Sequence, residues 1–75
     1  MEEKDYTKEA KLLIKKLMLQ EDINFIELTK ILKEKGFDYT EAAVRQKISR
    51  GRFDFAFCLQ IIGALNYKLN LEKDK

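Results

Sequence analysis

The sequence of 75 residues contains no histidine, one cysteine and only three glycines. Without histidine, the chain lacks both the usual neutral-pH general base and an imidazole ligand for a metal. A single cysteine can form neither an internal disulfide bond nor a thiolate metal site, and no glycine-rich phosphate loop occurs. We therefore expect that the protein is not an enzyme and that it uses no metal, cofactor or small-molecule substrate.

A long hydrophobic run is also missing. Residues 55–65 are the longest apolar stretch, but Gln60 interrupts them, and they are too short to span a bilayer. The first five residues, Met-Glu-Glu-Lys-Asp, lack the apolar region of a secretory signal. We therefore expect a cytoplasmic protein without a membrane partner, in which Cys58 is a reduced, buried thiol.

The chain has little excess of charge of one sign. Its 15 Lys and Arg residues are balanced by 13 Asp and Glu residues, which leaves a formal net charge of +2. A nucleic-acid partner must therefore be argued from where the cations lie and not from their number. With 45% hydrophobic and 37% charged residues, the composition fits one folded domain over residues 1–75, with a core of about residues 7–66.

The spacing of apolar residues predicts an all-α protein with four helices. Residues 6 to about 20 place apolar side chains three and four positions apart, which is the stripe of an amphipathic helix. The opposite face of this helix is rich in lysine, at Lys8, Lys11, Lys15 and Lys16. Such a face is either an ordinary solvated surface or a surface that flanks bound DNA and contacts phosphate.

Capping residues mark two more helices in the middle of the chain. Asn24 and Glu27 have capping-box spacing, and the helix that they begin ends before Gly36. Thr40 is a good N-cap for a short third helix that stops at Gly51. The predicted order is therefore helix, helix, turn, helix.

A fourth helix is predicted over residues 55–66, with Asp54 as its N-cap. This helix is apolar nearly all round. It should be the central element of the core, or it should bury a second face against a partner. Gly63 within it either permits the close approach of another helix or is simply tolerated near the helix end.

The tail after residue 66 alternates apolar and polar residues, with Tyr67, Leu69 and Leu71 on one side. This alternation is typical of a β-strand, but no second strand is predicted in the chain. The tail therefore either pairs with its counterpart in a homodimer or remains irregular.

The third helix is the stretch with the clearest functional signal. Val44 and Ile48 are apolar and one turn apart, so they predict a buried face, while the opposite face is polar. Four cations lie close together around Gln46, at Arg45, Lys47, Arg50 and Arg52. Arg and Gln make bidentate hydrogen bonds to base edges, and cations suit phosphates. We therefore interpret residues 40–50 as a DNA-recognition helix.

These features resemble the lambda-repressor-like helix-turn-helix proteins of the Cro and XRE type. In that family a Glu-Leu-Ala-like start of the second helix is followed by a recognition helix that ends in Ile-x-x-Gly. Here the corresponding segments are Glu-Leu-Thr at residues 27–29 and Ile-Ser-Arg-Gly at residues 48–51. The Lys-Ile-Ser-Arg-Gly-Arg-Phe segment at residues 47–53 is also similar to that of a set of small bacterial and phage proteins. The resemblance covers about residues 10–66 and implies sequence-specific DNA binding.

The chain departs from the lambda pattern in two places. The distance in sequence from Glu27 to Val44 is longer than in a minimal lambda-type unit, so the second helix or the turn is extended. Val44 and Ile48 are spaced by four residues, where the lambda pattern has three. Both differences can tilt or rotate the third helix relative to a DNA groove.

The docking geometry of helix-turn-helix proteins predicts two sets of contacts with double-stranded DNA. We expect base contacts from the start and exposed side of the third helix, namely Thr40, Glu41, Ala42, Arg45 and Gln46. We expect phosphate contacts from the surrounding cations and from the amides at the start of the second helix, namely Lys47, Arg50, Arg52 and Asn24. A single domain of this size offers little contact area, so a homodimer acting as a small transcriptional repressor is expected.

A protein-binding module is the alternative function. An antitoxin or adaptor could dock the apolar helix at residues 55–66 into a partner protein. A large exposed patch around Phe55, Phe57 and Leu59 would favour this alternative, in the absence of an electropositive face near Arg45 and Arg50.

Overall fold

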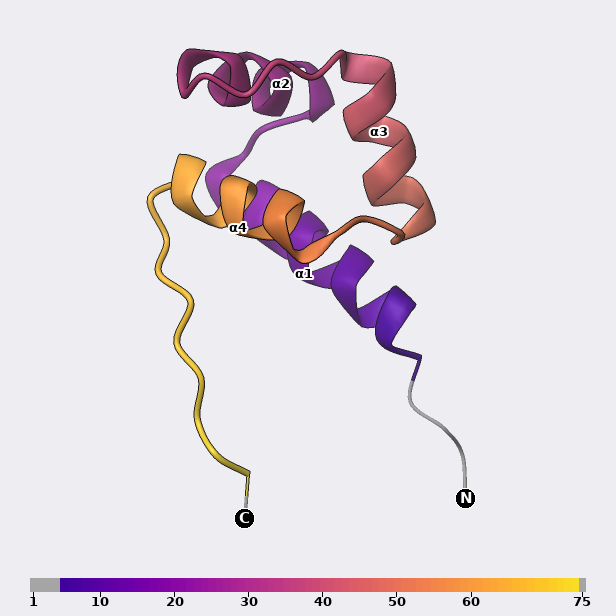
Figure 1. The fold of residues 1–75 in the computed structure, drawn as a ribbon, viewed down its shortest axis with the longest axis vertical. Helices are drawn as coiled ribbons and strands as arrows, with labels where there is room; N and C mark the ends of the chain where they lie inside the picture. Colours follow the sequence, from indigo (N-terminus) through magenta and orange to yellow (C-terminus); the bar gives the residue numbers. More distant parts are fainter. Residues whose placement is uncertain (1–4, 75) are drawn as a thin grey trace.

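Four helices connected by short segments make up most of residues 5–74, which are the residues described by the computed structural model (Figure 1). The helices are α1 (Tyr6–Glu21), α2 (Phe25–Glu34), α3 (Glu41–Arg50) and α4 (Phe55–Ala64). Residues 5–74 contain no strand. The prediction of an all-α protein with four helices is therefore confirmed, and the helix ends agree to within about two residues.

The helices begin where the capping residues predict. Asn24 Oδ1 accepts a hydrogen bond from the Glu27 amide at 2.8 Å, and Glu27 Oε1 accepts one from the Asn24 amide at 3.0 Å, which completes a capping box. The side chains of Thr40 and Asp54 accept hydrogen bonds from amides three residues later, at 3.1 and 2.8 Å. Each cap satisfies an amide that has no partner within its helix and stabilises the fold by about 1 kcal/mol.

Residues with a left-handed backbone conformation lie close to the ends of all four helices. Gly36 and Gly51 have φ angles of 93° and 66°, as their predicted roles in ending α2 and α3 require. Asp22 and Asn66 take the same kind of conformation after α1 and α4, with φ angles of 55° and 67°. Asp and Asn tolerate this region better than other side chains do, so these two helices end without glycine.

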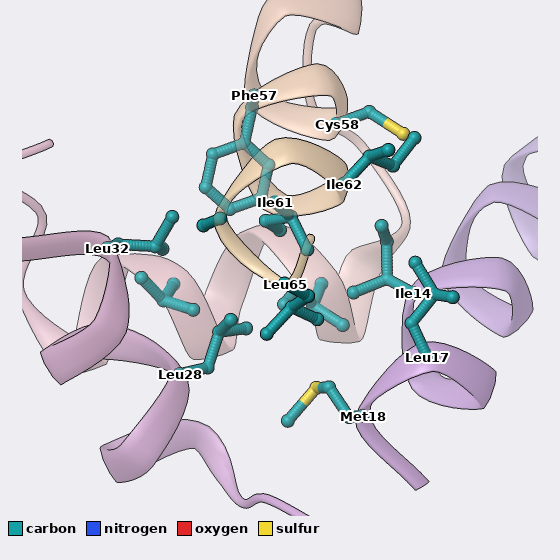
Figure 2. Close-up of a cluster of buried hydrophobic side chains, with 13 residues drawn as sticks. Ile14, Leu17, Met18, Leu28, Leu32, Phe57, Cys58, Ile61, Ile62 and Leu65 are labelled. Atoms are coloured by element: carbon teal, nitrogen blue, oxygen red, sulfur yellow. The ribbon is translucent and has the colours of Figure 1, made fainter. Parts of the chain in front are cut away.

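The core lies between the four helices, each of which contributes buried side chains. In Figure 2 the buried side chains of α4 point toward Leu28 and Leu32 of α2 and toward Ile14 and Leu17 of α1. The buried residues of α4 itself are Phe57, Cys58, Ile61, Ile62 and Ala64. The prediction that this helix is the central element of the core is therefore confirmed.

Cys58 is a free, buried cysteine, as the sequence predicts. Burial raises the pKa of its thiol, so the thiol stays protonated and poorly nucleophilic at neutral pH. No group of side chains suited to hold a metal ion occurs within residues 5–74. The helices of this part of the chain are also too short or too polar to cross a bilayer.

The outer side of α4 is only partly covered. Phe55 is 64% exposed and Leu59 is 42% exposed, so this helix keeps some apolar surface in contact with water. A Cβ atom added at Gly63 would meet nothing within 4 Å. Within residues 5–74 no other helix approaches Gly63 closely, so in the single chain Gly63 is a tolerated glycine near a helix end.

The tail leaves the helices as an extended segment without strand pairing in the single chain (Figure 1). Its first residue, Tyr67, donates hydrogen bonds from its hydroxyl to Glu21 Oε2 at 2.8 Å and to Gln20 Oε1 at 3.2 Å. The hydrogen bond to Glu21 raises the pKa of Tyr67. Beyond this anchor, Leu69 and Leu71 are 43% and 84% exposed. The apolar side of the tail is thus largely uncovered.

Candidate nucleic-acid interface

α3 lies at one edge of the molecule, with one side on the core and the other facing solvent (Figure 1). Val44 and Ile48 are completely buried, as their spacing predicts. They hold α3 against both α1 and α2. Because these two residues define the inward side of the helix, the residues opposite them are presented to water.

The outward side of α3 carries a polar stripe at helical spacing. Ala42, Gln46, Ser49 and Arg50 are all exposed; Gln46 lies four positions after Ala42, three before Ser49 and four before Arg50. Gln46 occupies the middle of this stripe. Thr40 is also exposed at the start of the helix, where its hydroxyl oxygen accepts the capping hydrogen bond and leaves its proton free to be donated. The stripe therefore combines hydrogen-bonding groups with a small residue.

Arg45 lies on the flank of α3 that faces α2. One guanidinium nitrogen donates a hydrogen bond to Glu41 Oε2, one turn earlier on the same helix. The guanidinium carbon also lies 5.1 Å from the centre of the Phe25 ring, within the range of a cation–π contact. Glu41 and Phe25 thus both contact the Arg45 side chain, which remains exposed, and the charge of Glu41 is compensated.

Lys47 lies on the opposite flank of α3, near α4. Its ammonium nitrogen is 5.4 Å from the centre of the Phe57 ring, and the residue is only partly exposed. Arg50 and Arg52, at the end of the helix and just beyond it, are exposed. The structure therefore spreads the four predicted cations around α3, with one on each flank and two at the C-terminal end.

Asn24 lies next to Phe25, and therefore close to the Arg45 side of α3. Its side chain is occupied by the capping box. The backbone amides at the start of α2 are the groups that remain to bind an anion there. The packing of Phe25 against Arg45 brings the start of α2 and the flank of α3 to the same part of the surface.

Tyr39 is a positioning residue that the sequence did not single out. Its hydroxyl donates a hydrogen bond to Gln60 Oε1 at 2.6 Å. Its ring meets the Phe57 ring edge to face, with the centres 5.2 Å apart and the planes at 89°. Gln60 is the main polar residue of the apolar helix α4. Its presence in the sequence could have indicated that α4 needs a hydrogen-bonding partner. Through these two contacts, Tyr39 attaches the segment just before α3 to α4.

A basic pocket is the second feature that sequence analysis did not find. An open pocket of about 260 Å³ lies between the first turns of α1 and the last turn of α3. Three of its six lining residues are cationic, and the full set is Asp5, Thr7, Lys8, Lys11, Ser49 and Arg50. The residues come from two distant parts of the sequence, so helical spacing alone could not predict their meeting.

Within residues 5–74, the fold and the surface together define a small all-α domain in which α1 and α3 both carry exposed cations. A family model described as "Domain of unknown function (DUF6471)" matches residues 6–69, a range that contains all four helices. The chain therefore belongs to the DUF6471 family. Neither a curated protein nor a solved structure matches the chain significantly.

Proposed function

We propose that the protein is a sequence-specific DNA-binding regulator of transcription and that α3 enters the major groove. The observation that carries this proposal is the outward polar stripe of α3, with Gln46 at its centre and cations on both flanks. An α-helix fits the major groove, where Gln and Arg distinguish bases by bidentate hydrogen bonds. In this proposal α2, the connection and α3 form a lambda-repressor-like helix-turn-helix unit.

Base reading falls to the start and middle of α3. Gln46 and Arg45 supply the bidentate groups, and Thr40, Glu41 and Ala42 lie at the end of the helix that reaches base edges first in helix-turn-helix docking. An isolated carboxylate near phosphates would be repelled. The ion pair with Arg45 compensates the charge of Glu41, so this residue is compatible with a DNA surface.

Phosphate binding falls to the periphery of α3. Lys47, Arg50 and Arg52 place positive charge on one flank and at the C-terminal end of the helix. The free amides after Asn24 offer an anion site beside the Arg45 flank. Phosphate contacts of this kind orient a protein on the duplex without selecting a sequence.

Two sets of substitutions separate base reading from phosphate binding. The double variant Arg45→Ala with Gln46→Ala should lose base preference, at about 1–3 kcal/mol for each bidentate contact removed. Arg50→Ala should weaken binding to all sequences evenly and should lower the salt slope by about one. Binding to a pool of randomised duplexes, with sequencing of the bound fraction, measures the first effect, and titration at several salt concentrations measures the second. If neither variant changes binding to any duplex, α3 is not the recognition helix.

A second copy of the chain is part of the proposal. One module covers only about 600–1,000 Å² on DNA, which favours two modules on a pseudo-palindromic site.

The exposed tail offers a self-complementary edge for such a dimer. If two tails pair antiparallel about Asn70, Leu69 of one copy lies opposite Leu71 of the other, and Lys68 lies opposite Glu72. This register pairs opposite charges on one face and leucines on the other.

A charge exchange tests this register. Lys68→Glu places like charges opposite each other twice in the dimer and should weaken dimerisation by about tenfold, because each unfavourable pair costs up to about 1 kcal/mol. Adding Glu72→Lys to the same chain restores opposite charges and should restore the dimer. Sedimentation equilibrium of the 8.9 kDa chain and its two variants measures the dissociation constant. Failure of the second substitution to rescue the first would exclude this pairing.

The alternative function, a protein-binding module, rests on the exposed part of α4. Phe55 and Leu59 remain accessible, but Phe57 is only 1% exposed and belongs to the core. The apolar patch is therefore smaller than the sequence indicates, while Arg45 and Arg50 are exposed on α3. These two observations support DNA as the partner in preference to a protein that docks on α4.

A further inference from the structure

The basic pocket between α1 and α3 has a surplus of positive charge that the fold itself does not use. Three of its lining side chains are cationic (Lys8, Lys11 and Arg50), two carry hydroxyl groups (Thr7 and Ser49), and one is acidic (Asp5). Asp5 Oδ1 accepts a hydrogen bond from the Lys8 amide at 3.1 Å, as the N-cap of α1. Within residues 5–74, none of the three cations is paired with a carboxylate.

Close packing of the backbone determines the position of these cations. Gly51, at the end of α3, lies against the first turns of α1. A Cβ atom built on Gly51 would come within 2.5 Å of the Thr7 carbonyl oxygen and 3.2 Å of Lys11 Cβ. The end of α3 therefore packs closely against the lysine-bearing turns of α1, and the side chains of Lys8, Lys11 and Arg50 line the same pocket.

The pocket is continuous with the surface proposed to read DNA. Ser49 and Arg50 belong both to the exposed stripe of α3 and to the wall of the pocket. A group bound in the pocket would therefore lie beside the groove that α3 enters. The nearest groups at the edge of that groove are the phosphates of the DNA backbone, whose charge and oxygen atoms suit ammonium, guanidinium and hydroxyl donors.

We infer that the pocket lined by Lys8, Lys11, Ser49 and Arg50 binds one phosphate of the DNA backbone beside the groove that α3 enters. This inference rests on the proposed function. It also divides the lysine-rich face of α1. Lys8 and Lys11 contact DNA, whereas Lys15 and Lys16, which do not line the pocket, are ordinary solvated side chains.

A matched pair of double variants tests the inference. Lys8→Gln with Lys11→Gln removes two charges from the pocket, and Lys15→Gln with Lys16→Gln removes two charges from the same helix outside it. Gln and Lys have similar helix propensities, so both variants should keep the urea midpoint of the wild type. Binding of each protein to a mixed-sequence duplex is measured by titration at several salt concentrations.

The pocket variant should bind about tenfold more weakly at low salt, with a salt slope smaller by about one, because one phosphate contact is lost. The control variant should keep the wild-type slope. Equal effects of the two variants would overturn the inference while leaving DNA binding intact. If the wild type binds no duplex at all, the proposed function itself fails, and the pocket assignment fails with it.

A parallel titration with inorganic phosphate identifies the source of the anion. The inference predicts at most weak binding of free phosphate, because a single small anion lacks the other contacts that a duplex makes with α3. Tight binding of inorganic phosphate that the pocket variant abolishes, without any change in its DNA salt slope, would assign the pocket to a free anion and would overturn the inference.

Discussion

Gly51→Ala should lower the free energy of unfolding by about 3 kcal/mol, which is a large fraction of the stability of a domain of this size. Two costs add at this position. The φ angle of 66° is one that only glycine adopts freely, and a Cβ atom would come within 2.5 Å of the Thr7 carbonyl oxygen. Relief of that contact requires the backbone of α1 or of α3 to move, so overpacking adds to the conformational cost. Urea denaturation measures the effect.

The other two glycines of the chain are matched controls for the two costs. Gly36 has a φ angle of 93° but no atom within 4 Å of an added Cβ, so Gly36→Ala should cost only the conformational part, about 1–2 kcal/mol. Gly63 lies in a helix with open space around it, and Gly63→Ala should stabilise the protein by up to about 1 kcal/mol. Equal losses at Gly51 and Gly36 would show that the contact with α1 contributes nothing.

Phe57→Ala should destabilise the protein by about 4 kcal/mol, the largest effect that we expect from one side chain. Phe57 is 1% exposed, and its ring contacts two other aromatic rings and one lysine. The Tyr39 ring meets it edge to face at 5.2 Å, the Phe53 ring lies at 5.4 Å, and the Lys47 ammonium nitrogen lies 5.4 Å from its centre. Truncation therefore leaves a cavity and removes the contacts that connect both ends of α3 to α4.

Phe55→Ala is the matched control, because it removes the same side chain from the same helix. Phe55 is 64% exposed, so its truncation should cost less than about 1 kcal/mol. Thermal and urea unfolding of both variants gives the comparison. A similar loss of stability for the two variants would mean that the Phe55 side of α4 is covered in solution, which would support the alternative function of this helix as a docking surface.

The two large effects concern the same structural requirement, namely the placement of α3. Gly51 holds the C-terminal end of α3 against α1, and Phe57 holds the flank and the preceding connection against α4. In the proposed function α3 has to be rigidly oriented for its side chains to meet base edges, since small errors in position remove bidentate geometry. Conservative variants that keep the fold but loosen these contacts should therefore reduce base preference before they reduce overall affinity.

The sequence by itself determined the local features of this protein. Asn24, Thr40 and Asp54 begin helices because their side chains accept hydrogen bonds from amides only three residues away, a relation that spacing alone defines. Val44 and Ile48 are buried for a similarly local reason, since four residues make about one helical turn. The positions of the helices and the outward stripe of α3 were predictable on this basis.

The tertiary structure decided which helical faces meet, and through them the detail of the candidate site. Arg45 lies over the Phe25 ring, the Tyr39 hydroxyl donates a hydrogen bond to Gln60, and Lys8 and Lys11 line one pocket with Arg50. Each of these contacts joins residues far apart in sequence. The periodicity of apolar residues along one helix does not predict how far that helix lies from another. Side-chain packing and the close approach at Gly51 determine that distance, together with the angle at which the helices pack.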